Sequence, residues 1–194
     1  PSGVYKVVAD VAAYEVANNP AGGPIDSNPY GVLAQPGRRI VADAGGNSVI
    51  EVLANGRTRT FAVLGAPGAQ TVPTSVTEGP DGAIYVADWY DRFVGGHGTD
   101  DDSLSGTIYR IAPKGFVSKA PAFNTETIDG LITALRSPAV NVRAIGFEGL
   151  RARGAAAVNA VAAMLNDPSP YMRGRAIYLL YQLGPEGVQR AGSP

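Results

Sequence analysis

The sequence predicts a mixed fold in which a β region comes first and an α region follows, and three observations indicate it. Glycine and proline are frequent in residues 18–115 and less frequent afterwards. A β-type repeat recurs after 44 to 45 residues in the first region, and a helical repeat recurs after 30 residues in the second. These periods predict a partial β-propeller of about two blades, built as antiparallel meanders, followed by an α-α solenoid of about two repeats.

The β region is expected at residues 28–115, after an N-terminal strand and short helix in residues 1–27 that lead into it. Asp10 can cap that helix, at residues 10–19, before Pro20 stops it. Five later stretches are short, rich in β-branched or aromatic residues and bounded by turn residues, which is typical of strands. They are residues 39–44, 48–56, 57–64, 83–89 and 106–115.

The β repeat aligns NPYGVLAQPGRRIVADA (28–44) with VPTSVTEGPDGAIYVADW (72–89), with one inserted residue. Pro29 then matches Pro73, 44 residues later, and Asp43 matches Asp88, 45 residues later. This period is the length of one four-stranded propeller blade. A sandwich of similar hairpins would give no reason for a repeated Val-Ala-Asp, so the repeat favours blades.

Residues 116–126 carry neither period and predict a linker, after which residues 127–194 have the period of a helix. Two apolar faces with i, i+3, i+4, i+7 spacing are Ile128, Leu131, Ile132 and Leu135, and Val158, Val161, Ala162 and Leu165. SPAVNVRAIGFEGLRARG (137–154) aligns without a gap with DPSPYMRGRAIYLLYQLG (167–184). We expect about four helices in antiparallel pairs, each repeat helix opened by Pro138 or Pro168 in its first turn and closed by Gly154 or Gly184.

Several of these stretches resemble known families. The Val-Ala-Asp segment followed by a strand such as TIYRI (107–111) resembles NHL-type six-bladed propellers. Residues 12–34 with 38–52 resemble the secreted propellers encoded in scytonemin pigment clusters. Residues 87–116 resemble the last blade of secreted propeller-plus-HEAT proteins of the membrane-bound dehydrogenase type, and DPSPYMRGRA (167–176) resembles phycobilisome-lyase-type HEAT repeats.

The resemblance implies HEAT-like repeats in residues 127–194 and an extracellular or periplasmic location, although the first residues carry no signal peptide. Closed propellers need roughly four to eight blades and solenoids roughly three repeats. We therefore expect a fragment, a trimmed hybrid or a shortened family member. Its open blade or solenoid ends would allow self-association.

Two functions follow from these expectations. The first is a non-catalytic binding module without a cofactor, whose propeller rim and HEAT surface engage a protein or glycan partner. The alternative is a fragment of a quinoprotein-like sugar or alcohol dehydrogenase propeller that uses calcium and the quinone cofactor PQQ. A melting temperature that is insensitive to calcium would argue against the alternative, because binding to the folded state raises stability.

The rim loop at residues 90–105 holds most of the candidate site residues. His97, the chain's only histidine, would be the catalytic base of the alternative enzyme. Carboxylates are the ligands that calcium prefers, but their spacing here fits no EF-hand, and a solvated acidic loop with aspartates capping turns is the favoured explanation. The candidate calcium ligands are Asp88, Asp91, Asp100, Asp101 and Asp102.

Four charged residues at repeated positions are interpreted as structural. Asp43 and Asp88 end strands, where an aspartate can accept hydrogen bonds from the backbone of the following turn. Arg143 and Arg173 occupy the same repeat position, and we expect them to pair with acidic or carbonyl groups of the adjoining repeat. The indole of Trp89 is expected to pack between blades.

The composition excludes several classes of site. A net charge of −1, with seven arginines against five acidic residues in 126–194, argues against nucleic-acid binding. The absence of cysteine excludes disulfides, thiolate metal sites and covalent haem attachment. No apolar run approaches the roughly 20 residues of a transmembrane segment.

Overall fold

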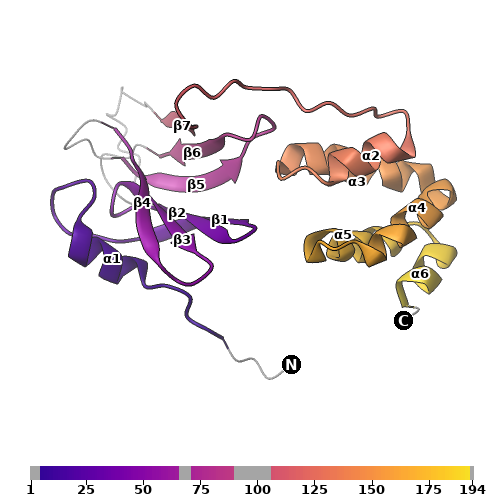
Figure 1. Cartoon of the computed structure of the whole chain (residues 1–194), viewed down its shortest axis with the longest axis horizontal. Helices are drawn as coiled ribbons and strands as arrows, with labels where there is room; N and C mark the ends of the chain where they lie inside the picture. Colours follow the sequence, from indigo (N-terminus) through magenta and orange to yellow (C-terminus); the bar gives the residue numbers. More distant parts are fainter. Residues whose placement is uncertain (1–4, 66–70, 90–105, 193–194) are drawn as a thin grey trace, which may run out of the picture. The chain divides into compact units, whose positions relative to one another are not determined.

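The computed structural model describes residues 5–65, 71–89 and 106–192 (Figure 1). These residues divide into a β unit, up to Glu78 and from Ala83 to Phe116, and a helical unit, made of 79–82 and everything from Val117 onward. The mixed fold class, β first and then α, is confirmed. Each unit is described by itself.

The first sheet of the β unit is an antiparallel meander in which each strand pairs with the next along the chain. Its strands are β1 (Pro29–Gln35), β2 (Arg38–Asp43), β3 (Ser48–Leu53) and β4 (Thr58–Val63). Tight turns connect them, and Gly37 and Gly56 supply the positive φ angles, 79° and 83°, that two of these turns require. The strand β1 is not among the predicted strands, because its sequence begins with proline and its burial alternates only weakly.

The second sheet repeats the start of the first. It contains β5 (Pro73–Glu78), β6 (Ile84–Asp88) and β7 (Thr107–Ile111), again antiparallel and in sequence order. Pro29 pairs with Asp43 across β1 and β2, and Pro73 pairs with Asp88 across β5 and β6, with a register shift directly after each proline. The two copies of the sequence repeat therefore form the same strand pair with the same bulge.

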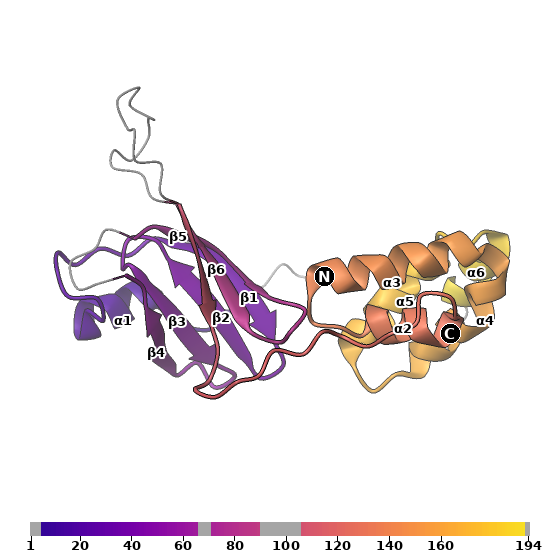
Figure 2. The same cartoon turned by 90° about the horizontal axis from the view of Figure 1, so that it is seen from above.

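The first sheet is covered on both faces, which explains why β2 and β3 are almost continuously buried. One face meets the second sheet through a shared apolar cluster: Ile40, Ala42, Val49, Leu64, Val76, Ile84 and Val86. The other face carries α1 (Val11–Asn18), whose Tyr14 and Val11 pack on Val41, Ile50 and Val52. Figures 1 and 2 show this layering of helix, first sheet and second sheet. Asp10 caps α1, as predicted, by accepting a hydrogen bond from Ala13 N at 2.9 Å.

The helical unit contains five α-helices, one more than expected. They are α2 (Ile128–Leu135), α3 (Val140–Arg153), α4 (Val158–Ala163), α5 (Pro170–Leu180) and α6 (Pro185–Gly192). Two 3₁₀ segments, η1 (Gly154–Ala157) and η2 (Met164–Asn166), flank α4. The unexpected helix is α6, whose short sequence is rich in glycine but starts with proline at a position where its missing N–H costs nothing.

The two helical repeats differ from the expectation at both starts and agree with it at the end of α3 only. Pro138 and Pro168 lie in the turns before α3 and α5, two residues ahead of the first helical residue, and not in the first helical turn. Gly154 directly follows α3 with a φ angle of 54°, as predicted, whereas Gly184, with a φ angle of 89°, lies four residues beyond the last residue of α5, Leu180, and directly precedes α6.

The predicted apolar faces of the helical unit form its core. Leu131, Leu135, Val158 and Val161 are at most 1 % exposed, and Ile128, Ile132, Ala162 and Leu165 pack around them. The equivalent helices α3 and α5 contact each other (Figures 1 and 2). Across the described ranges, no helix has both the length and the apolar character that a membrane crossing needs.

Candidate functional site

The residues of the predicted rim loop fall outside the described part of the chain. His97, Asp91 and the aspartates at 100–102 all lie between residues 90 and 105. Asp88 and Trp89, which precede this segment, are described. Trp89 is 52 % exposed, so its indole is not buried between the two described sheets, contrary to the expectation that it packs between blades. Within residues 5–65, 71–89 and 106–192, no three His, Asp or Glu side chains gather closely enough to hold a metal ion.

The two strand-end aspartates make the same backbone contact. Asp43 is fully buried, and its Oδ1 accepts hydrogen bonds from Asn28 N at 2.6 Å and Gly46 N at 3.1 Å. Its Oδ2 accepts one from Ser27 Oγ at 2.7 Å. Asp88 Oδ1 likewise accepts a hydrogen bond from Val72 N at 2.6 Å. Each aspartate thus binds the residue that precedes the proline of the neighbouring strand, a contact that fixes where β1 and β5 begin.

Arg143 and Arg173 also make equivalent contacts, but not to the partners that we expected. Arg143 Nη1 donates to the carbonyls of Ser137, at 3.3 Å, and Pro138. Arg173 Nη1 donates to those of Asp167, at 2.8 Å, and Pro168, at 3.0 Å. These carbonyls belong to the turn before the arginine's own helix and not to the adjoining repeat, because a side chain one turn into the helix reaches back over its N-terminus. Each arginine therefore stabilises the turn that precedes its own helix.

The contact between repeats is made by other residues. Arg136, at the end of α2, forms an ion pair with Asp167, between η2 and α5, at 2.5 Å. Arg175 of α5 reaches α2, where its Nη1 donates to Leu135 O at 2.7 Å. These residues were not predicted, because they depart from the repeat: the position of Arg175 is occupied by Ile145, 30 residues earlier. Arg175 is evident only when the two repeats are compared for residues that differ between them, and not for residues that match.

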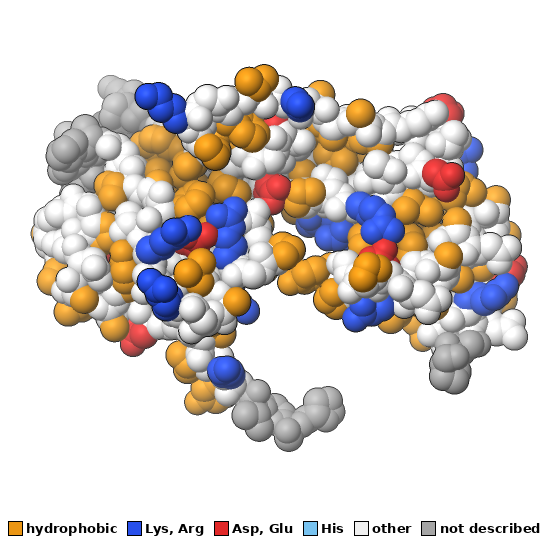
Figure 3. Space-filling view, viewed as in Figure 1, with side chains coloured by type: hydrophobic (Ala, Val, Ile, Leu, Met, Phe, Trp, Pro, Cys, Tyr) orange, Lys and Arg blue, Asp and Glu red, His pale blue; other side chains and the backbone are white. Residues whose placement is uncertain are grey.

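Arg143 and Arg175 line a pocket of about 310 Å³ in the helical unit. Most of its wall is apolar, contributed by Leu135, Val140, Ala144 and Phe147, and Glu148 completes it. Figure 3 shows Lys and Arg side chains beside hydrophobic ones on the helical unit. The pocket is an open hollow whose volume is at the lower end of the roughly 300–1,000 Å³ typical of ligand sites, so it is a candidate contact surface for a partner.

The electrostatics of this pocket are unbalanced. Burial, and then the positive charge of Arg143, lower the pKa of Arg175. Among the described residues, neither guanidinium group forms an ion pair with a carboxylate. Glu148 is in the wall, but its carboxylate accepts a hydrogen bond from Arg151 Nε at 2.8 Å. Two like charges are therefore held close together by backbone carbonyls without a counter-ion.

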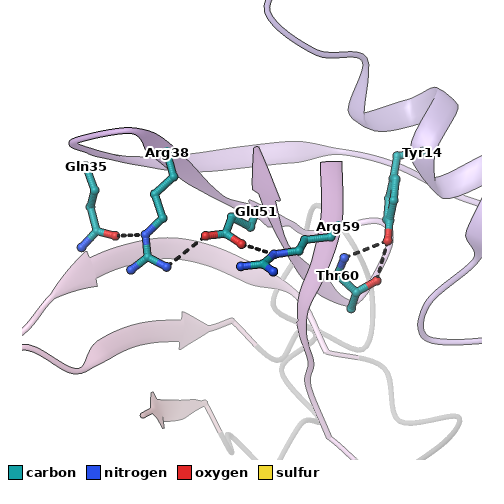
Figure 4. Close-up of polar contacts among 6 residues, drawn as sticks. All are labelled: Tyr14, Gln35, Arg38, Glu51, Arg59 and Thr60. Carbon is teal, nitrogen blue, oxygen red and sulfur yellow. Dashed lines mark hydrogen bonds and ion pairs between the residues drawn. The ribbon is translucent and has the colours of Figure 1, made fainter. Parts of the chain in front are cut away.

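The β unit contains a different polar network, in which charges are balanced (Figure 4). Glu51 of β3 is 1 % exposed, and its two carboxylate oxygens pair with Arg38, at 3.0 Å, and Arg59. Arg38 Nε donates to Gln35 Oε1 at 2.7 Å, and the amide of Gln35 donates to Glu78 of the second sheet. Burial alone would raise the pKa of Glu51, but the hydrogen bonds from Arg59 and Arg38 outweigh it and hold that pKa below its usual value. This network is structural, since its charges satisfy one another.

A second buried glutamate has the opposite environment. Glu15 of α1 is 1 % exposed, and its Oε2 has no hydrogen-bond partner among the described residues. A Cβ placed on Gly46 would lie 3.0 Å from Glu15 Oε2 and 3.3 Å from Asp43 Oδ2, so both carboxylates face the same turn. Burial raises the pKa of Glu15, and the negative charges of Asp43 and Asp26 raise it further.

Glu15→Gln is therefore expected to stabilise the β unit at neutral pH. A raised pKa means that ionised Glu15 opposes folding, and this penalty grows as the pH rises from the ordinary value of 4.5 through the folded-state pKa. The neutral amide removes the penalty, for an expected gain of about 1 kcal/mol. Urea unfolding followed by fluorescence of Trp89, the chain's only tryptophan, measures it. The same variant should show no gain below pH 4.5; a gain that is equal at both pH values would contradict the electrostatic explanation.

No protein-family model, curated protein or solved structure matches the chain. The resemblances noted in the sequence therefore remain hypotheses, and the functions that they imply remain proposals. The pocket lined by Arg143 and Arg175 is a candidate ligand site of the helical unit.

Proposed function

We propose that the chain is a non-catalytic interaction module, which engages a protein or glycan partner through the surface of its helical unit. The observation that supports this best is the apolar pocket with Arg143 and Arg175 in its wall. Placing two like charges in a partly desolvated site is unfavourable for the free protein. An anionic group of a partner would remove that repulsion, and this relief would contribute to the free energy of binding.

The proposal includes a more specific description of both units. The β unit would be part of a β-propeller, since its two meanders share a register, a bulge after proline and a strand-end aspartate. The helical unit would consist of HEAT-like repeats, since Arg143 and Arg173 make the same contacts 30 residues apart. Modules of both kinds commonly present extended surfaces to partners.

Binding can be tested before the partner is identified. The full chain is screened against a glycan array and a random-peptide phage library, in parallel with the double variant Arg143→Gln/Arg175→Gln. We expect ligands that the full chain retains and the double variant loses, because the pocket's charge is what attracts them. Arg173→Gln removes the same charge and the same kind of carbonyl contact away from the pocket, and should keep those ligands. Two outcomes would contradict the proposal: the double variant retains the same ligands, or the full chain retains no ligand in either screen.

A further inference from the structure

The pocket of the helical unit combines a net positive charge with a mostly apolar wall, and this combination specifies a partner. We infer that it binds an acidic peptide segment, with an aspartate or glutamate carboxylate between Arg143 and Arg175 and a neighbouring apolar side chain on Phe147 and Val140. The inference rests on the proposed function and names the chemistry of the partner at that site.

The two guanidinium groups are held ready for a carboxylate. The hydrogen bonds that they make with described residues all run through Nη1, to the carbonyls of Ser137, Pro138 and Leu135 and to the sulfur of Met172. A guanidinium group has five N–H donors in a planar fork, so Nε and Nη2 of each arginine remain to donate to a ligand. Fixing the side chains in advance reduces the entropy that binding would otherwise cost.

The size and lining of the pocket match a pair of peptide side chains. A volume of about 310 Å³ is small for an oligosaccharide or a cofactor. Leu135 is buried and Phe147 is half-buried, so most of the wall offers apolar contact, and its polar side chains are the charged ones of Arg143, Glu148 and Arg175. Val140, 58 % exposed, extends the apolar surface outward for a neighbouring residue of the peptide.

A phosphorylated or nucleic-acid partner fits less well. Glu148 lines the same pocket, so the wall carries two positive charges and one negative charge, and a singly charged carboxylate neutralises this set more closely than a doubly charged phosphate does. The helical region has only a small excess of arginines over acidic residues, which does not give the extended positive surface that a phosphate backbone requires. A single carboxylate is the anion that this balance of charges favours.

The test measures binding of two fluorescein-labelled hexapeptides to the full chain by fluorescence polarisation at low salt. One has a central aspartate–phenylalanine pair, and the other has asparagine in place of the aspartate. We expect the aspartate peptide to bind about tenfold more tightly or better, since charge-assisted hydrogen bonds are about twice as strong as neutral ones. Arg143→Gln and Arg175→Gln should each lower its affinity by a similar factor, whereas the matched control Arg173→Gln should leave it within about twofold.

Val140→Glu gives a second variant that does not threaten folding, because Val140 is exposed. The added carboxylate should weaken binding of the aspartate peptide more than that of the asparagine peptide, because both lose the apolar contact with Val140 but only the aspartate is also repelled. Equal binding of the two peptides, or affinity that survives all three pocket substitutions, would overturn the inference. If no acidic peptide binds but the two screens return a glycan or a peptide without acidic residues that needs Arg143 and Arg175, this inference fails and the proposed function stands.

Discussion

Replacing Gly146 with alanine is expected to destabilise the helical unit by about 2–3 kcal/mol, even though alanine is the better helix former. A Cβ at this position would lie 2.5 Å from Leu135 N and 2.6 Å from Leu131 O. These are backbone atoms of α2, so no side-chain rotation can relieve the clash, and the two helices would have to separate. Urea unfolding of the full chain, followed by far-ultraviolet circular dichroism, measures the loss.

Gly174→Ala is the matched control. Gly174 also lies inside a helix, α5, but a Cβ there would meet no atom within 4 Å. This substitution should stabilise the same unit by about 0.5–1 kcal/mol, since glycine is disfavoured in helix interiors. The prediction is thus a difference in sign between two identical chemical changes. A stabilising or neutral Gly146→Ala would show that α2 and α3 do not approach as closely as described.

Removing the charge of Glu51 is expected to destabilise the β unit by about 1–3 kcal/mol at neutral pH. Glu51→Gln keeps the size of the side chain but loses both ion pairs. The cost stays below that of a fully buried pair because the side chains of Arg38 and Arg59 are 35 % and 67 % exposed and can be hydrated instead. Trp89 fluorescence during urea unfolding follows this unit.

The pH dependence of that effect has a definite sign. Because the pKa of Glu51 is lowered on folding, its contribution is fully present above the ordinary value of 4.5 and is lost as the pH falls through the folded-state pKa. The difference between the wild type and Glu51→Gln should therefore shrink in acid, whereas the difference for Glu15→Gln appears only as the pH rises. Glu186→Gln, on the exposed start of α6, should change stability by less than about 0.5 kcal/mol. A Glu51 effect that is constant with pH would rule out an ionic origin.

The sequence predicts this fold best where a pattern is repeated. The Val-Ala-Asp segments, the two apolar helix faces and the glycine that ends α3 are all evident in the sequence, because each follows from a local period or from backbone stereochemistry. The strands β1 and β5 are not predicted as strands, since each begins with proline and is placed by a partner strand. The last helix is not predicted because three of its eight residues, 185–192, are glycine or proline.

The candidate site is less predictable than the fold. Arg143 stands out because it recurs as Arg173, but its expected partners are wrong, since sequence spacing does not show that a side chain folds back on its own turn. Arg175 follows no repeat and gives no signal of that kind. Its importance comes from tertiary contact with α2 and from proximity to Arg143, neither of which leaves a periodic pattern.

The bonds of Asp43 and Asp88 have a consequence for the order of folding. Asp43 reaches Asn28, 15 residues away, and Asp88 reaches Val72, 16 residues away. Loops of this length close quickly and at little entropic cost, and every strand of both sheets pairs only with its chain neighbour. Because its strand pairings are local in the sequence, the β unit is expected to fold quickly once its strands have been synthesised. Synthesis of such a chain leaves few unpaired strands exposed at any moment, which limits aggregation before the helical unit is complete.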